Sequence, residues 1–300
     1  MLHNFIDVCY NRFMQRRKVK VIANAKVNFS LNITGTQNNM HTLDMILASI
    51  DLSDVVTVCE RFDEKVIVEY SDKRIEVGED SVSKAIELVR ERIGKIGIEV
   101  FVQKNIPFCG GLGGSSADAA GALLALDKLY GLREKGVKMD IIASKVGSDV
   151  WYMMHGGFAR VQGVGDKLDF FAAKVPLYLV VVQGEGGVLS GDSYREFDRM
   201  FESKVYKPTD TETCITALKN FADPAKILPH MNNALQKPSI ALNPTIQSTL
   251  IHLEKAGAQK AMMTGSGSAC IGIFENTKDA ETAAKKLSKL GLYAVATKTI

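Results

Sequence analysis

The sequence predicts an α+β protein of two domains. Strand and helix patterns alternate along the chain, without internal repeats or low-complexity segments. The C-terminal end reads strand, loop, strand, helix, strand, an order typical of an α+β sandwich. A chain of 300 residues with 46% hydrophobic residues is long enough to bury one large core or two modest ones. We therefore expect an ordinary globular protein.

The first predicted strand is the longest. From Val19 to Ile33 the odd positions are apolar and most even positions are polar, and this period of two indicates a strand with one buried face. Lys26 and Asn28 share the other face and are close enough to address one ligand together. A solvent-exposed polar face explains the same pattern, and this segment alone does not separate the two interpretations.

Shorter elements follow the first strand. A helix is expected over residues 81–93, with Ser81 as its N-cap. Further strands are predicted at residues 54–59, 65–70, 97–104, 157–162, 176–182, 261–263, 270–274 and 293–297. Further helices are predicted at residues 117–130, 138–146, 190–202, 209–220, 231–237, 243–255 and 277–290.

The domain boundary is predicted near residue 172. The apolar run at 176–182 opens the second domain, because helical patterns dominate after it. The organisation expected is a solvated tail over residues 1–18, an N-terminal domain over 19–172 and a C-terminal domain over 173–300.

Charge and cysteine content exclude several classes of protein. The 37 Lys and Arg residues nearly balance the 34 Asp and Glu residues, so no basic field points to nucleic acid as a partner. The five cysteines are scattered, odd in number and without a C-x-x-C pair, which argues against a disulfide framework and a zinc site. No apolar run is long enough to cross a bilayer, and the first residues lack a signal-peptide core. We expect a cytoplasmic protein without a membrane partner.

A glycine-rich run from Pro107 to Asp118 is the most informative motif. Its glycines, at positions 110, 111, 113 and 114, are expected to take positive φ and to turn backbone N–H groups toward one point. The small-residue helix that follows directs the positive end of its dipole to the same place, so we expect a phosphate there. The chain has no G-x-x-x-x-G-K-[ST] motif, and Ser116 stands at the third glycine of G-x-G-x-x-G. A plain glycine-rich turn is the alternative interpretation.

Three separated segments together resemble the three motifs of the GHMP small-molecule kinases. They are Ala25-Lys-Val-Asn28, Pro107-x-x-x-Gly-Leu-Gly-Gly-Ser-Ser-Ala-Asp118 and Thr264-Gly-Ser-Gly-Ser-Ala-Cys270. The likeness covers about residues 19 to 297. It implies an N-terminal α/β domain like that of ribosomal protein S5 and a C-terminal α+β sandwich.

Smaller pieces resemble the members of this family that act on an alcohol carrying a cytidine diphosphate group. These pieces are Asn28 to Gly35 leading to His41, Asp51-Leu-Ser-Asp54, Lys104-Asn-Ile-Pro107, Gly147-Ser-Asp149-Val, Gly163-Val-Gly165-Asp, Gly187-Val-Leu-Ser190 with Tyr194, and Asn232-Asn-Ala-Leu235. The substrate implied is a small molecule of this kind.

The resemblance implies phosphoryl transfer from ATP, with Mg²⁺, to a substrate hydroxyl in a cleft between the domains. Asp149 matches the general base and Lys26 lies beside it. Residues implied to bind ATP are Lys104, Gly111, Gly113, Gly114, Ser115 and Ser116, with the Ser116 hydroxyl near the metal. Residues implied to bind substrate are Asn28, His41, Tyr194, Thr264 and Gly265, with His41 at the cytosine end.

Other interpretations of these residues stay open. Asp149 is also a candidate N-cap, and a lone histidine is often a surface or hydrogen-bonded residue. The loop from Thr264 to Ser268 is flexible by composition, so we expect it to close over phosphate or substrate, although a plain turn between strands looks alike.

The chain also departs from the family pattern. Where the family usually reads Gly-Tyr-His, this chain reads Asn39-Met40-His41, so an aromatic that stacks on the cytosine is missing. Ser115 replaces a third glycine, and Ala117 a second serine. Two alternatives therefore remain: a kinase for another alcohol, such as mevalonate, homoserine or a sugar, and a homologue that binds nucleotide without turnover. The protein is expected to be a monomer or a homodimer.

Overall fold

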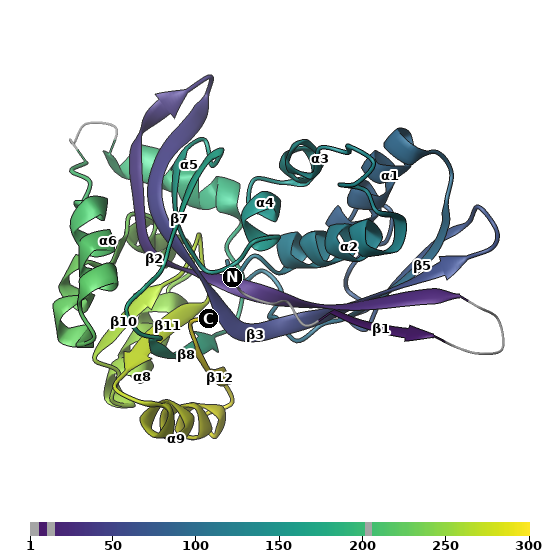
Figure 1. The fold of residues 1–300 in the computed structure, drawn as a ribbon. Coiled ribbons are helices and arrows are strands. Elements are labelled where there is room, and N and C mark those ends of the chain that lie inside the picture. Colours follow the sequence, from purple (N-terminus) through teal and green to yellow (C-terminus); the bar gives the residue numbers. More distant parts are fainter. Residues whose placement is uncertain (1–5, 11–15, 202–205) are drawn as a thin grey trace. The chain divides into compact units, whose positions relative to one another are not determined.

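The structure, a computed structural model, describes residues 6–10, 16–201 and 206–300 (Figure 1). Helices and strands are mixed throughout, as the α+β prediction requires. Contacts divide the chain into two units, each built from separate segments. The first unit holds Met1–Ala25, Leu52–Ile106 and Gly113–Gly156, and the second holds Lys26–Asp51, Pro107–Leu112 and Gly157–Ile300. The boundary near residue 172 stays a prediction.

The strands of the N-terminal half follow the order β1-β2-β3-β5-β4. They are β1 (Ile6–Tyr10), β2 (Arg17–Gln37), β3 (Met40–Arg61), β4 (Val66–Tyr70) and β5 (Gly97–Gln103). In the first unit β1 runs antiparallel to the start of β2, β5 runs antiparallel to the end of β3, and β4 runs parallel to β5. Residues 6–10, expected within a tail, thus form a strand.

Four helices belong to the first unit: α1 (Ser81–Ile93), α2 (Gly114–Tyr130), α3 (Met139–Val146) and α4 (Val150–Met153). The bounds of α1 are those predicted, but its predicted cap is wrong. Asp80 is the N-cap, and its carboxylate accepts a hydrogen bond from the N–H of Ser83 at 2.9 Å. A carboxylate at this place satisfies a free amide and also favours the positive end of the helix dipole.

Helix α2 lies very close to the strands beneath it. A Cβ atom added to Gly121 would be 2.8 Å from Val56 Cγ2 and 3.3 Å from Ala23 Cβ. Only a residue without a side chain lets the helix approach β2 and β3 at this distance. Gly121 therefore sets the spacing between helix and sheet in the first unit.

The second unit contains a separate antiparallel sheet of order β10-β11-β8-β12. Its strands are β8 (Tyr178–Gln183), β10 (Lys260–Met263), β11 (Cys270–Phe274) and β12 (Tyr293–Lys298). Helices α8 (Thr245–Lys255) and α9 (Thr277–Ser288) pack on this sheet and contact each other, so both lie on one face (Figure 1). This is the sandwich pattern predicted for the C-terminal end.

The same unit holds the inner parts of β2 and β3 with three further strands. These are β6 (Phe158–Gly163), β7 (Lys167–Phe171) and β9 (Asn232–Asn233). Its remaining helices are α5 (Ser190–Phe201), α6 (Thr211–Asn220), α7 (Gln236–Leu242) and two short 3₁₀ turns, η1 (Pro224–Lys226) and η2 (Leu228–His230). The helix predicted over residues 231–237 is wrong, because β9 pairs in parallel with β2 through Ser30 and Leu31, and α7 begins only at Gln236.

The polar face of β2 is buried, not half-exposed. Lys26 is 6% exposed, and Asn28, Ser30 and Asn32 are fully buried. Asn32 shows how these groups are satisfied: its amide donates to Thr209 O and Thr211 Oγ1 at 3.0 Å each. The expectation of a half-buried strand holds for the outer part of β2 and is wrong from Lys26 to Ile33.

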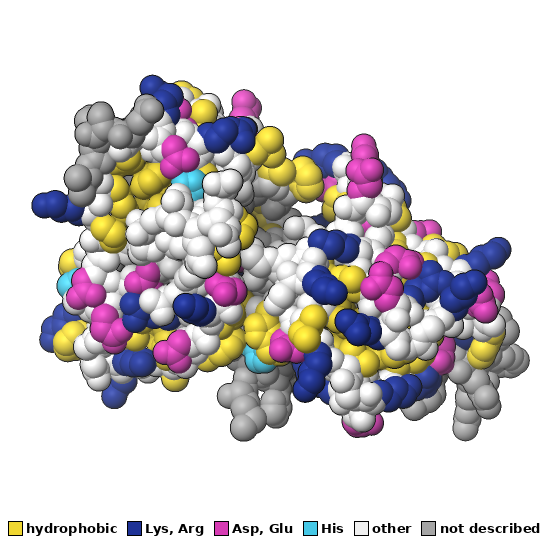
Figure 2. All heavy atoms as spheres, turned by 90° about the horizontal axis from the view of Figure 1, so that it is seen from above, with side chains coloured by type: hydrophobic (Ala, Val, Ile, Leu, Met, Phe, Trp, Pro, Cys, Tyr) yellow, Lys and Arg dark blue, Asp and Glu magenta, His cyan; other side chains and the backbone are white. Residues whose placement is uncertain are grey.

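The surface shows no field of one charge sign on the face seen in Figure 2, where basic and acidic side chains are interspersed. Within the described ranges, no helix combines the length and apolar character needed to cross a membrane.

We predict that Gly121→Ala lowers the free energy of unfolding by about 1–3 kcal/mol, because the methyl group overpacks the contact with Val56. Urea denaturation measures the change. Gly191→Ala is the matched control: Gly191 is an exposed position in α5, where a Cβ would meet only the end of Arg195, so this change should be neutral or stabilising. An unchanged midpoint in Gly121→Ala would contradict the close packing.

Candidate active site

The inner part of β2 places two predicted site residues together in the second unit. Lys26 Nζ donates to Asn28 Oδ1 at 2.9 Å, so the two side chains address one region, as their spacing predicted. The backbone is held on both sides: Lys26 N–H donates to Leu112 O at 3.0 Å, and Asn28 N–H donates to Thr264 Oγ1 at 2.9 Å. The strand therefore joins the glycine-rich segment and the loop after β10.

These two segments pack backbone against backbone. A Cβ on Gly111 would lie 2.6 Å from Thr264 O, and one on Gly265 would lie 2.7 Å from Gly111 O. Both glycines have positive φ, 74° for Gly111 and 57° for Gly265. Ala269 N–H also donates to Gly110 O at 3.2 Å. The structure thus gathers Lys26, Asn28, Gly111, Thr264 and Gly265 into one cluster.

The Thr264–Ser268 loop is part of the interior. All five of its residues are buried, Thr264 completely. The expectation of a flexible loop is wrong, because hydrogen bonds with five other segments hold it. The partners are Asn28 for Thr264, Asn233 for Gly265, Ser190 and Ser239 for Ser266, and Gly186 for Ser268.

The second half of the glycine-rich run opens α2 in the first unit. Gly113 is the N-cap with a left-handed φ of 73°, and no side chain caps the helix. Positive φ occurs at Gly111 and Gly113 but not at Gly110 and Gly114, so the expectation for the last two is wrong. Gly114 serves close approach: a Cβ there would lie 3.2 Å from Ile106 Cγ2 and 3.5 Å from Lys104 Nζ.

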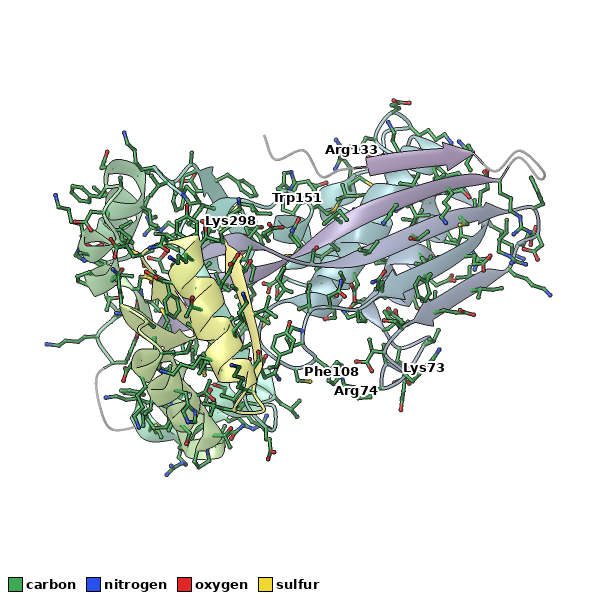
Figure 3. The ribbon with its side chains drawn as sticks, turned by 90° about the horizontal axis from the view of Figure 1, so that it is seen from below. Lys73, Arg74, Phe108, Arg133, Trp151 and Lys298 are labelled. Carbon is green, nitrogen blue, oxygen red and sulfur yellow. The ribbon has the colours of Figure 1, made fainter. Side chains whose placement is uncertain are left out.

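An uncapped helix start beside a loop of alternating handedness fits an anion such as a phosphate. Ser115 is exposed in the first turn of α2, and Ser116 is partly exposed. Phe108, labelled in Figure 3, is 47% exposed at the start of the run. In the part of the chain that the structure describes, no group of three or more His, Cys, Asp or Glu side chains is arranged to hold a metal ion.

Asp149 stands immediately before α4, next to the turn that approaches Ser116. It occupies the N-cap position, but its side chain makes no capping hydrogen bond, so the capping interpretation does not explain its carboxylate. A Cβ on Gly147 would lie 4.0 Å from Ser116 Oγ, which places this turn beside the start of α2. Trp151, in α4, follows in the same segment (Figure 3). Asp149 belongs to the first unit and Lys26 to the second, and their pairing stays a prediction.

Lys104 is held between two buried carboxylates. Its Nζ pairs with Asp54 and, at 2.5 Å, with Asp118 Oδ2. Asp54 also accepts from the backbone N–H of Ile106 at 2.8 Å. The side chain of Lys104 is 9% exposed, so this lysine braces the start of α2 against β3. Its predicted contact with ATP stays a prediction, and sequence reasoning did not find the two carboxylates as its partners.

One ammonium group cannot compensate both acids. Asp118 Oδ1 is buried without a hydrogen-bond partner. Burial raises the pKa of Asp118 to about 8, and the nearby charge of Asp54 adds to the rise while Lys104 opposes it. Burial also lowers the pKa of Lys104, but its two acidic partners outweigh that effect, and the pKa is raised. The cluster therefore holds a proton near neutral pH.

His41 lies in a second cluster, built by β3 and one face of α5. Its Nε2 is 2.8 Å from Asp198 Oδ1, and its ring stacks on Tyr194 at 4.8 Å between centroids and 22° between planes. Phe197 meets the same imidazole edge-on at 6.4 Å. One side of α5 therefore contacts the histidine, because helical spacing places Tyr194, Phe197 and Asp198 on the same face. Sequence reasoning named His41 and Tyr194 but missed Asp198.

The neighbouring Met40 is 53% exposed. It follows the tight turn between β2 and β3, where Asn38 and Asn39 have φ of 50° and 61°. Two consecutive left-handed residues are typical of a type I′ hairpin, and asparagine tolerates this conformation better than most residues. The turn presents Met40 to solvent at the position where an aromatic side chain was expected.

Comparisons with known proteins show the family of this chain. Residues 80–157 match the model of the GHMP kinases N terminal domain, and residues 214–291 match that of the GHMP kinases C terminal domain. A protein of Streptococcus uberis, provisionally named as a 4-diphosphocytidyl-2-C-methyl-D-erythritol kinase, is 33% identical over 263 residues, which are 86% of this chain and 90% of that protein.

Solved structures extend the comparison. A crystal structure of 4-(cytidine 5'-diphospho)-2C-methyl-D-erythritol kinase has a TM-score of 0.79 and 27% identity, and the match covers 93% of this chain and 98% of that one. A homoserine kinase from Cytophaga hutchinsonii has a TM-score of 0.69 at 19% identity, with 97% of each chain covered. The latter likeness concerns the fold alone.

We predict that stability falls as pH rises through the range in which Asp118 loses its proton. The folded-state pKa of about 8 lies above the ordinary value, so the folded protein binds more protons than the unfolded chain. This contribution to stability is fully present near pH 4 and is lost as pH rises through about 8. The free energy of unfolding should be about 2–3 kcal/mol higher at pH 6 than at pH 8.5.

Urea denaturation at several pH values measures this slope. Asp118→Asn should flatten it, whereas Asp127→Asn, in the same helix, should keep it. If the free energy of unfolding of Asp118→Asn falls with pH as steeply as that of the parent, the proton belongs to another group.

Proposed function

Because this chain belongs to the GHMP kinase family, we propose that it transfers the γ-phosphoryl group of ATP to a hydroxyl of 4-diphosphocytidyl-2-C-methyl-D-erythritol. The reaction would be a step of the non-mevalonate route to isoprenoid precursors. The observation that supports this substrate is how much of the chain resembles proteins named as kinases of the same compound. Similarity to the provisionally named streptococcal protein and to the crystal structure of that kinase runs through most of the chain, in sequence as well as in fold.

The chain's own residues would act mainly by positioning. A phosphoryl transition state needs little covalent assistance, so catalysis depends on alignment and on neutralising charge. The backbone of Gly111 to Ser116 would hold the phosphates of ATP. The left-handed φ of Gly111 and Gly113 and the uncapped start of α2 support this role.

Magnesium fits this site as a companion of the nucleotide. The described residues offer no dedicated cage of acidic ligands, so Mg²⁺ would be held by phosphate oxygens together with the Ser116 hydroxyl. When bound, Mg²⁺ neutralises charge on the transferred group. Lys104 would support the same region indirectly, since its ammonium group is already engaged by Asp54 and Asp118.

Asp149 would accept the proton of the attacking hydroxyl. Its place at the start of α4, beside the turn that approaches Ser116, supports this role. The proposal requires Lys26 to address the same hydroxyl and to keep Asp149 ionised by its positive charge. Asn28, which accepts from Lys26 at 2.9 Å, would fix the direction of that ammonium group, and Thr264 and Gly265 would line the same end of the substrate site.

The cytidine end would be read by the cluster around His41. Tyr194 supplies an aromatic face, and Asp198 holds the imidazole in one orientation. Met40 offers a polarisable thioether where the tyrosine of the family pattern is missing. A weaker hold on the base is expected, with the preference for this substrate kept.

We also propose a cytoplasmic protein, acting as a monomer or a homodimer, without nucleic acid as a partner. The described side chains of Cys59, Cys109, Cys214 and Cys270 are free thiols, which supports a reducing compartment.

Asp149→Asn is expected to lower turnover by about two orders of magnitude or more, because only the proton acceptor is lost. A coupled assay of ADP release measures turnover, and calorimetry with ADP checks that nucleotide binding is kept. Asp140→Asn, an exposed acid in the first turn of α3, is the control and should behave like the parent. Parent-like turnover in Asp149→Asn would remove this residue from the mechanism.

Met40→Tyr should lower the KM for 4-diphosphocytidyl-2-C-methyl-D-erythritol by about three- to tenfold and leave that for ATP unchanged, because a stacked aromatic pair adds about 0.5–1.5 kcal/mol. Leu290→Tyr, at another exposed apolar position, is the control. Steady-state kinetics should also rank this substrate above mevalonate, homoserine and galactose. Activity on one of those alcohols, with none on the cytidine compound in parent and variant alike, would keep the kinase and reject the substrate. Nucleotide binding without turnover on any alcohol would favour a non-catalytic homologue.

A further inference from the structure

Two side chains around β9 hold the backbone that leads into the Thr264–Ser268 loop. The amide nitrogen of Asn233 donates to two carbonyl groups, Met263 O at 2.9 Å and Gly265 O at 2.8 Å. Its amide oxygen accepts from Leu235 N–H at 2.9 Å. Gln236 holds the same backbone, because its Oε1 accepts a hydrogen bond from Met263 N–H at 2.9 Å.

The chemistry of these contacts is specific to amide side chains. Two carbonyl partners require a donor with two hydrogens, and the Leu235 N–H requires an acceptor on the same side chain. Asparagine meets both demands at position 233. An aspartate of the same shape would set a carboxylate oxygen against two carbonyl oxygens, so charge and shape can be separated experimentally at this position.

The held backbone is the part of the loop that touches the glycine-rich segment. Thr264 O and Gly265 crowd Gly111 so closely that neither glycine has room for a Cβ. The rest of the loop is tied by hydroxyl groups: Ser239 Oγ donates to Ser266 O at 2.9 Å, and Ser190 Oγ lies 2.8 Å from Ser266 Oγ. Displacement of Gly265 therefore cannot be absorbed within the loop and passes to Gly111.

We propose that Asn233 and Gln236 are positioning residues for nucleotide binding: they hold Met263–Gly265 against Gly111 and so fix the phosphate-binding backbone. This inference rests on the proposed function, because it takes Gly111 as part of the ATP site. Neither side chain contacts the nucleotide in this account. Their larger effect is on affinity for ATP and ADP, and a smaller effect on the alcohol follows because Thr264 and Gly265 also line the substrate site in the proposed function.

The test compares Asn233→Asp with Asn232→Asp. Asn232 is the adjacent residue of β9, and its side chain forms hydrogen bonds with Ser30, Leu31, Asn32 and Thr209, none of which belongs to the loop. Asn233→Asp should raise the KM for ATP and the Kd for ADP about tenfold, and raise the KM for the alcohol by a smaller factor. Asn232→Asp should lower the thermal midpoint but leave both nucleotide constants at the parent values.

A second pair of variants tests the other contact. Gln236→Glu keeps an acceptor for Met263 N–H and should retain nearly the parent KM for ATP, whereas Gln236→Met removes the acceptor at similar length and should raise it several-fold. This pair decides the question if Asn233→Asp does not fold. The inference is overturned if Asn233→Asp or Gln236→Met lowers the thermal midpoint while the nucleotide constants stay unchanged.

The readouts separate this inference from the proposed function. Turnover of the parent protein with ATP and the cytidine substrate tests the function. The ratio of ADP affinities between parent and variants tests the positioning role and needs no turnover. If the parent protein binds ADP but has no kinase activity, the proposed function is rejected, and the positioning role can still be tested by comparing ADP affinities. If the parent protein binds no nucleotide, both are rejected.

Discussion

The buried polar face of β2 is the constraint on which the second unit depends. A strand that carries Lys26, Asn28, Ser30 and Asn32 into the interior must satisfy each group, since an unpaired buried polar atom costs about 1–3 kcal/mol. The partners come from distant segments: Thr264 for the backbone of Asn28, Asn232 for Ser30, and Thr209 and Thr211 for Asn32. The hydrogen bonds that satisfy the polar groups of β2 therefore fix three other segments: the loop that follows β10, strand β9, and the start of α6. The residues to which we assign chemistry and the residues that hold the fold lie on the same strand face.

Much of the fold was predictable because its signals are local. The bounds of α1 and β11 are those expected from periodicity, and most other elements differ from prediction only at their ends. The failures occur where long-range contacts decide. Residues 231–237 have helical spacing, but the side chains of Asn232 and Asn233 bond to β2 and to the loop, and the backbone pairs as a strand. The first part of β3 was missed as well, although Asn38-Asn39 is a signal for the type I′ turn that begins it.

The sequence indicated the motif residues of the candidate site but not the side chains that orient them. Motif order indicated Lys26, Asn28, the glycine-rich run and Thr264, and the structure brings those of the second unit into one hydrogen-bonded cluster. The partners that orient them have no motif. Asp54 and Asp118 lie far apart in sequence and meet around Lys104, and Asp198 reaches His41 from another element. Such pairs form between residues that are distant in sequence, and a single sequence does not show which distant residues come into contact. Composition also misled: a loop rich in glycine and serine is buried, because its hydroxyl groups serve as internal partners.

The two ends of the glycine-rich run are held by different physical means, and the difference suits a phosphate site. Gly111 is fixed by close backbone contact with Thr264 and Gly265, and these two residues are held by neutral hydrogen bonds, which keep their strength across pH. Gly114 lies over a buried cluster with two carboxylates for one ammonium group, whose stability depends on proton uptake. Because negative charge of that cluster near the start of α2 opposes an anionic ligand, the proton held by Asp118 favours phosphate at the same helix terminus. If the chain binds ATP as proposed, the electrostatics of the first unit would link nucleotide affinity to pH, whereas the neutral hydrogen bonds of the second unit would not.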